Sequence, residues 1–361
     1  MKKIKFPFNL CAGFLATMLL LVAGCATSNK VATNYYFFPP PPNEPRLQFL
    51  TSFSSETEFR GKEDKTFMNF LTGERPPDRS LGKPYGAAAG NKKIYICDTD
   101  LGAVLVVDLQ DRRIKMLAAD GEGSLEQPLN ISVDGDGSIY VTDVSRNQVV
   151  IFNKDGGFVA ALGKTGDLKP RDAVASADRI YVADLQKHNV RVFDKTTRNE
   201  LFEFPQGQEA TNRAHALFTP TNLALDAKGR LYVSDTGAFR IQVYDADGHF
   251  LRSVGEMGDS TGQFARVKGV AVDRENQLYA VDAMSKVVQV FNEQGQVLTW
   301  FSAPDNQNMI LNLPSKVVVD YEDVDAFQSF AAPGFKIEYL VYVINQLGPH
   351  KVNVYGYGQR K

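Results

Sequence analysis

The sequence of 361 residues has little cysteine, little histidine and almost no net charge, and each shortage excludes a class of protein. Three cysteines cannot form the dense disulfide scaffold that stabilises small exported domains. The net charge of −2, from 40 basic and 42 acidic residues, gives no support to a nucleic-acid partner. Cys97 lies in the apolar run 94–97, where a lone cysteine usually acts as a small buried hydrophobic residue.

Motifs for metal binding and for covalent catalysis are also scarce. The four histidines are scattered along the chain: His188, His215, His249 and His350. This scatter disfavours a metal site with three histidine ligands. The segment 134–138 resembles the start of a calcium-binding loop, but Ile139 and Ser145 stand where such a loop requires glycine and glutamate. Because no cysteine or serine stands beside a recurring base, we expect no catalytic residue, no metal and no cofactor.

The first 25 residues have the plan of a secretory signal peptide. Three lysines precede an apolar stretch at 14–21, which is too short to span a membrane stably. The stretch leads into Val-Ala-Gly-Cys at 22–25, which resembles the lipobox of bacterial lipoproteins. This resemblance implies that residues 1–24 are removed and that Cys25, acylated with palmitate-type chains, anchors the protein to a membrane.

Residues 25–45 are predicted to form a tether after the lipidated cysteine. Ala26 follows Cys25, whereas an aspartate at that position usually retains a lipoprotein in the inner membrane. The resemblance therefore implies the outer membrane, with the periplasmic or surface orientation left open. Four prolines at 39–42 favour an extended, semi-rigid segment.

One β-rich pattern recurs along the rest of the chain. Each copy contains an apolar residue, a tyrosine, two further residues and an aspartate. The copies end at Asp98, Asp143, Asp184, Asp235 and Asp282, and a degenerate sixth ends at Asn345. A period of about 40–50 residues is typical of propeller blades. Recurrence of the aspartate in every unit favours a role in capping turns over an acidic ring.

The third strand of each unit carries a family resemblance. The sequence at 188–193 is His-Asn-Val-Arg-Val-Phe and that at 239–244 is Phe-Arg-Ile-Gln-Val-Tyr, and both resemble NHL repeats. The resemblance covers residues 46–357 and implies an all-β, six-bladed β-propeller. Five blades are complete, and the sixth lacks an outer strand. We therefore expect the N-terminal strand 47–53 to complete the last blade and close the ring, leaving 358–361 as a tail.

The loops that follow each second strand and the connections between blades are expected to lie at the same end of the ring. Long loops on a rigid scaffold are common binding sites. The candidate side chains on this face are Arg146, His188, Phe239, Arg240, Lys286 and His350. We therefore predict a non-enzymatic binding or scaffold module of the cell envelope with a protein partner. Two alternatives stay open: a propeller enzyme of the lyase or lactonase type, and a carbohydrate or peptide sensor.

Overall fold

The computed structural model describes residues 34–40, 42–60, 78–164, 166–305 and 308–360. The predicted signal peptide, Cys25 and the first part of the tether lie outside these ranges. No helix in the described ranges is long and apolar enough to cross a membrane.

Five blades are four-stranded antiparallel meanders whose strands follow one another in sequence. Blade one contains β3 (Pro84–Gly90), β4 (Lys93–Asp98), β5 (Ala103–Asp108) and β6 (Arg113–Met116). Blade two contains β7 (Pro128–Val133), β8 (Ile139–Asp143), β9 (Gln148–Phe152) and β10 (Phe158–Leu162). Blade three contains β11 (Pro170–Ala175), β12 (Arg179–Asp184), β13 (Asn189–Asp194) and β14 (Glu200–Phe204).

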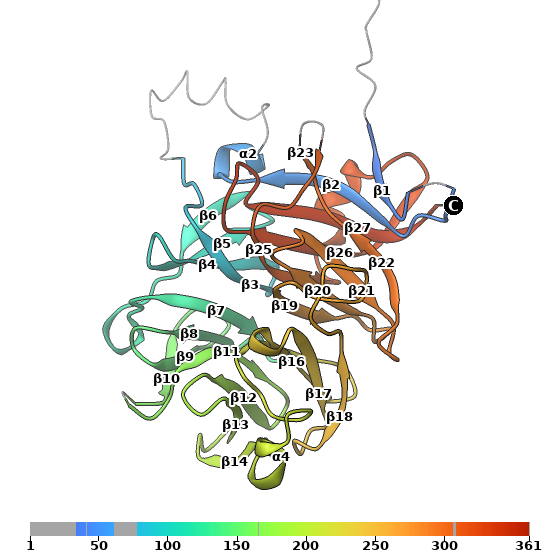
Figure 1. Ribbon diagram of the computed structural model, residues 1–361. Helices are drawn as coiled ribbons and strands as arrows, with labels where there is room; N and C mark the ends of the chain where they lie inside the picture. The colour runs from blue at the N-terminus through green and yellow to red at the C-terminus, as the bar shows by residue number, and fades with distance from the viewer. Residues whose placement is uncertain (1–33, 41, 61–77, 165, 306–307, 361) are drawn as a thin grey trace, which may run out of the picture. The chain divides into compact units, whose positions relative to one another are not determined.

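The next two blades repeat this plan. Blade four contains β15 (Pro220–Leu225), β16 (Leu231–Asp235), β17 (Arg240–Tyr244) and β18 (Phe250–Val254). Blade five contains β19 (Val267–Val272), β20 (Leu278–Asp282), β21 (Val287–Phe291) and β22 (Val297–Phe301). The first strand of each blade contacts the first strand of the next, and β25 (Pro314–Asp320) of blade six contacts β3 of blade one, which closes the ring (Figure 1).

Blade six joins the two ends of the chain, as the sequence predicted. Its sheet has the order β1-β2-β27-β26-β25, in which β2 (Leu47–Phe53) pairs with β27 (Val352–Arg360), and β26 (Phe335–Asn345) lies between β27 and β25. The six-bladed fold and the closure by the N-terminal strand are therefore confirmed. A ring closed in this way leaves no unpaired blade face in solvent.

Two boundaries differ from the expected ones. β1 (Tyr36–Phe38) lies inside the range 25–45 and pairs with β2 as a fifth strand, because Phe38 is buried against Phe301 and Tyr355 with ring centroids 6.1 and 6.4 Å away. Three residues are too few to show a strand period in a sequence. At the other end, β27 runs through Arg360, so residues 358–360 are strand and not tail.

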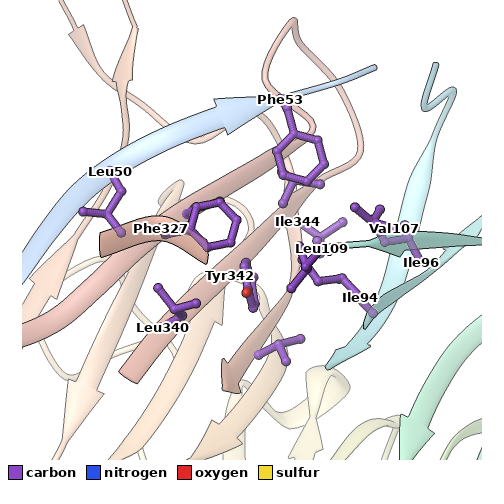
Figure 2. Packing of buried hydrophobic residues seen from close by; sticks show 14 of the residues in the cluster. Leu50, Phe53, Ile94, Ile96, Val107, Leu109, Phe327, Leu340, Tyr342 and Ile344 are labelled. Carbon is purple, nitrogen blue, oxygen red and sulfur yellow. The ribbon is translucent and has the colours of Figure 1, made fainter. Parts of the chain in front are cut away.

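The core lies between neighbouring blades. Alternation along each strand places apolar side chains on both faces of every blade, where they meet those of the next blade. Figure 2 shows this packing where blade six meets blade one: Phe53 and Tyr342 are fully buried with Ile94 and Ile96. The insertion between β25 and β26, which contains α5 (Val324–Phe327), buries Phe327 in the same cluster. Burial of each such side chain stabilises the fold by about 1.5–3 kcal/mol.

Candidate functional site

The recurring aspartates tie the loops of one end of the ring together. Asp143 is fully buried and accepts backbone N–H bonds from Glu126 at 2.6 Å, in the connection that enters its blade, and from Ser145 at 3.1 Å, in the following turn. Asp98 and Asp282 bind the equivalent backbone groups of their own blades. The predicted turn-capping role is therefore confirmed, and the aspartates are structural.

We call this end, where the aspartates lie, the loop face; it comprises the turns after the second strands and the connections between blades. The last residue of the turn has a left-handed backbone in five blades: Gly102, Asn147, His188, Phe239 and Lys286, with φ between 55° and 60°. This conformation favours glycine and asparagine and is strained for other residues. Three candidate binding residues thus occupy a position that is defined by backbone geometry.

The other three candidate residues make contacts within the ring. Arg146 donates to the carbonyl groups of Glu122 and Ser124, and Arg240 donates to those of Arg213 and Ala216. These arginines hold the connections 117–127 and 205–219 in place. His350 Nδ1 lies 2.9 Å from Ser52 Oγ, which joins the turn of β26 and β27 to β2.

Of the three candidates with a left-handed backbone, two are exposed on the loop face. Lys286 is exposed, and His188 is exposed while its Nδ1 lies 2.6 Å from the carbonyl oxygen of Phe218. Phe239 is half-buried. The structure therefore brings the six candidate residues to one end of the ring, but the side chains of Arg146, His188, Arg240 and His350 are bonded to neighbouring segments of the chain.

Sequence reasoning missed a set of exposed apolar side chains on the loop face. They lie in the turns of blades one, five and six and in the connections that enter blades four and five: Leu101, Met284, Leu347, Phe218 and Met257. On the described turns of the opposite end, the large exposed hydrophobic residue is Phe330. The sequence pattern that could have revealed them was an apolar residue inside a turn segment that is otherwise polar. Exposed apolar residues gathered on one face mark interaction surfaces.

The innermost strands bring polar side chains to the centre of the ring. Lys316 of blade six donates a hydrogen bond of 2.8 Å to Asp172 of blade three, and both side chains are buried. Burial raises the pKa of the Asp172 carboxyl, although Lys316 opposes this shift. Asn130 and Asn222 occupy the equivalent strand positions, are fully buried, and each has at least one side-chain amide atom without a protein hydrogen-bond partner.

In the described residues, the fold assembles neither a metal-binding cluster nor a nucleophile elbow. In the described parts of the chain, no group of three or more histidine, cysteine, aspartate or glutamate side chains is arranged to hold a metal ion. Sequence reasoning also missed that residues 258–262 have the spacing Gly-x-Ser-x-Gly of a nucleophile elbow. That elbow requires a strand-to-helix turn, whereas Ser260 lies exposed in the loop between two strands, β18 and β19.

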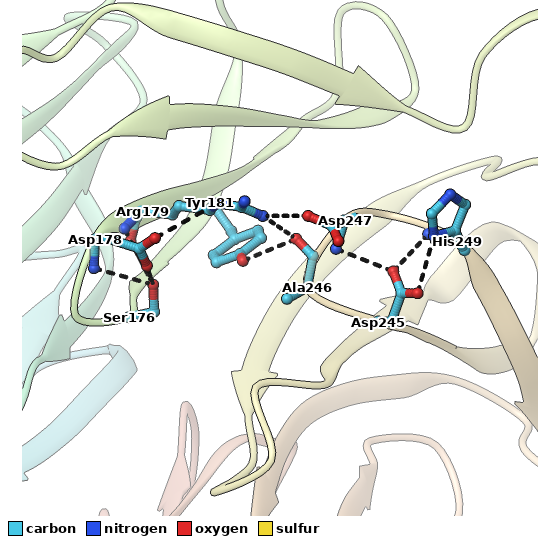
Figure 3. A network of polar contacts seen from close by, with 8 residues as sticks. All are labelled: Ser176, Asp178, Arg179, Tyr181, Asp245, Ala246, Asp247 and His249. Atoms are coloured by element: carbon cyan, nitrogen blue, oxygen red, sulfur yellow. Dashed lines mark hydrogen bonds and ion pairs between the residues drawn. The ribbon is translucent and has the colours of Figure 1, made fainter.

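A groove of about 530 Å³ lies between the rims of blades three and four. Its walls contain Phe202, Phe250 and His215, and the His215 and Phe250 rings stack with centroids 4.2 Å apart. Next to it, a polar network joins the two blades (Figure 3). Arg179 of blade three donates to Ala246 O at 2.6 Å and to Asp247 at 2.9 Å in blade four.

Comparisons with known proteins agree with this architecture. A protein family described as a 6-bladed beta-propeller matches residues 214–342. NHL repeat-containing protein 2 of Gallus gallus is 26% identical over 192 residues, which cover 49% of this chain and 22% of that protein. Protein brain tumor of Drosophila melanogaster is 28% identical over 142 residues, 37% of this chain and 13% of that protein. The chain thus spans less than a quarter of the length of these relatives.

Solved structures extend the similarity to most of the chain. A gluconolactonase from Xanthomonas campestris has a TM-score of 0.55 at 15% identity, covering 90% of this chain and 98% of its own. A streptogramin B lyase has a TM-score of 0.52 at 13% identity, covering 76% and 83%. Identities this low show the fold alone. Together with the sheet order and the recurring strand pattern, these similarities identify the chain as a six-bladed β-propeller built from NHL-type repeats.

Proposed function

We propose that this propeller is a non-enzymatic binding module of the bacterial cell envelope, anchored in the outer membrane through Cys25, that binds a protein partner on its loop face. The observation that carries the proposal is the set of exposed apolar side chains on that face, defined above as Leu101, Met284, Leu347, Phe218 and Met257. A soluble surface does not gain stability from such side chains, whereas an interface does.

The chemistry of the loop face fits a protein partner. Methionine and aromatic residues are enriched in the buried centres of protein interfaces, and flexible methionine side chains adapt to the shape of a partner. Phe218, Met257 and Met284 supply these types. The scaffold beneath them is rigid, because buried aspartates and the side chains of Arg146 and Arg240 hold the loops. Preorganised loops lose little conformational entropy when they bind.

Site-specific crosslinking in intact cells tests the loop face. A photoreactive amino acid is placed at position 284 or 101, and at position 330 on the opposite end as a matched exposed control. We expect positions 284 and 101 to capture the same defined protein and position 330 to leave it uncaptured. Capture that is equal from all three positions would contradict the proposal.

A variant then measures the contribution of the apolar side chains. Leu101→Ser combined with Met284→Ser is expected to weaken capture through position 347 about tenfold, since central apolar contacts dominate interface energies. Both side chains are exposed in the free protein, so the melting temperature is expected to stay within a few degrees of the parent.

The lipid anchor is tested separately by labelling cells with an alkyne fatty acid. The parent chain is expected to carry the label and to fractionate with the outer membrane, while Cys25→Ala loses both properties. Labelling of Cys25→Ala at the level of the parent would refute the anchor and leave the loop-face proposal standing.

The groove between blades three and four favours a second candidate function, the recognition of a carbohydrate or peptide. Aromatic walls offer stacking surfaces, and the Glu209 side chain, bonded to His215, offers a polar contact at the edge. A volume of about 530 Å³ suits one or two sugar rings or a short peptide. Titration calorimetry with cell-wall oligosaccharides, comparing the parent with Phe250→Ala, tests this function.

A further inference from the structure

The single tryptophan of the chain lies half-exposed on the outer rim of the propeller. Trp300 is in β22, the outermost strand of blade five, and is 50% exposed. Leu298, two residues earlier, is also exposed. Leu298 is the extra residue of a β-bulge in this strand, and both side chains are exposed, so together they form one apolar strip on the rim.

The repeats show which part of this strip is special to blade five. The residue equivalent to Leu298 is apolar and exposed in blades two, three and four as well: Val159, Leu201 and Leu251. Trp300 pairs with the third strand of its blade at the position that is occupied in blades two, three and four by Ala161, Glu203 and Ser253. Those three residues are small or polar. The repeat therefore accounts for Leu298, but it leaves the exposed tryptophan unexplained.

Trp300 lies on the part of the rim where the N-terminal segment joins the propeller. β1 contacts β22 (Figure 1). The rings of Phe38 and Phe301 lie 6.1 Å apart. Tyr35, which precedes β1, is exposed. Residues 26–35 separate Cys25 from β1, and ten residues span at most about 35 Å. A lipid on Cys25 would therefore hold the start of β1 within about 35 Å of the membrane, so that this part of the rim can reach it.

We propose that the rim formed by β1 and β22 lies on the lipid bilayer, with Trp300, Leu298 and Tyr35 in its interfacial layer. This inference rests on the proposed lipidation of Cys25. Tryptophan and tyrosine are the side chains that concentrate at membrane interfaces, because each combines a large apolar ring with a polar group. Arg360, exposed and positioned over the Phe37 ring of β1 at 5.8 Å, adds a positive charge that suits anionic headgroups.

This contact would orient the propeller. A rim that lies on the bilayer leaves the axis of the ring parallel to the membrane plane. The loop face then points sideways along the membrane, where a second envelope protein can reach it. Without the rim contact, a tether of this length would let the propeller adopt many orientations.

Because the chain has one tryptophan, its fluorescence reports on this contact alone. The acylated protein, purified from membranes, is reconstituted into vesicles of phosphatidylethanolamine and phosphatidylglycerol that contain brominated lipids. We expect the Trp300 emission to shift to shorter wavelength and to fall by about half, since bromine quenches only an indole in the bilayer. In the control variant, Trp300→Ser with Ala161→Trp, the tryptophan stands at the equivalent position of blade two on the opposite side of the ring. Its emission is expected to keep the unquenched intensity.

Two outcomes would overturn the proposal: Trp300 emission that brominated lipids leave unchanged, or equal quenching in the control variant. Fatty-acid labelling decides separately whether Cys25 is acylated in cells. If it is not, the chain with Cys11→Ser is coupled at Cys25 to a maleimide phospholipid and the quenching is measured again. Cys97 is fully buried and its thiol pKa is raised by burial, so it stays unreactive. Quenching in the coupled chain would support the rim contact even where the proposed anchor fails.

Discussion

The ammonium group of Lys316 lies 2.8 Å from the carboxylate of Asp172 across the centre of the ring, and it joins blade six to blade three. The two residues are 144 positions apart in the sequence, and both side chains are buried. Asp172 also accepts the backbone N–H groups of Ala173 and Leu223. One buried ion pair therefore connects the innermost strands of three blades.

Removing the cation of this pair is expected to destabilise the fold strongly. Lys316→Met leaves a carboxylate buried without its partner, which costs about 3–5 kcal/mol. Adding Asp172→Asn is expected to recover part of this loss, because the amide oxygen still accepts a backbone hydrogen bond. Urea unfolding measures both effects. Lys115→Met, which breaks an exposed pair with Asp111, serves as the control and is expected to cost less than about 1 kcal/mol. Equal losses for Lys316→Met and Lys115→Met would contradict this interpretation.

A close approach of two innermost strands predicts a steric effect at Gly269. A Cβ atom at this position would lie 2.5 Å from Lys316 Cα and 2.7 Å from the Ser315 carbonyl oxygen. Backbone atoms cannot give way without moving the strand, so Gly269→Ala is expected to cost about 3 kcal/mol or more. Gly135→Ala, where a Cβ meets nothing within 4 Å, is expected to be nearly neutral. Thermal unfolding of the two variants decides the point, and a neutral Gly269→Ala would show that β19 and β25 can separate.

The left-handed turn position predicts a stabilising substitution. Lys286 has φ of 60°, and blade one has Gly102 at the equivalent place. Lys286→Gly removes the strain of a Cβ in this conformation and is expected to stabilise the fold by about 0.5–1 kcal/mol. Met284→Gly, in the same turn without a positive φ, is expected to destabilise it, since glycine adds freedom to the unfolded chain. If chemical unfolding finds that Lys286→Gly destabilises the fold as Met284→Gly does, the backbone strain at Lys286 is negligible.

Two neighbouring carboxylates, Asp320 at the end of β25 and Asp323 in the insertion that follows it, predict that stability depends on pH. Burial and the neighbouring Asp320 carboxylate raise the pKa of Asp323 to about 7. Because this value lies above that of the unfolded chain, the contribution of Asp323 to stability is present below about pH 4 and is lost as the pH rises towards 7.

Asp323→Asn removes this loss. The stability gain of the variant over the parent is expected to grow by more than about 1 kcal/mol from pH 5 to pH 8. Urea unfolding at the two pH values measures it. Asp325→Asn, at an exposed position two residues away, controls for the removal of one negative charge. A gain that does not change with pH would show that the pKa of Asp323 is not raised in the folded protein.

Local pattern within each repeat was sufficient to predict the blades, the capping role of the aspartates and the closure by strand 47–53. The blades and the capping role depend on neighbours within one unit of the repeat, and the unit recurs often enough to average out chance. The closure, which pairs the two ends of the chain, followed from counting strands, because the sixth unit lacked an outer one. Asp143 illustrates this, since its partners Glu126, Gln127 and Ser145 lie within 17 positions of it. The strand period, the turn residues and the spacing therefore agreed with one another.

The tertiary structure alone decided which polar side chains are free and which apolar ones stay exposed. Arg146 and Arg240 are of a residue type that anchors interfaces, but carbonyl groups of loops 22 to 27 residues away accept their hydrogen bonds. The pairing of Lys316 with Asp172 and the exposure of Met284 likewise depend on how the blades meet around the ring. A sequence pattern with a short period records which face of a strand is buried. It contains no information about which distant loop reaches a given side chain, because closure of the ring sets that distance.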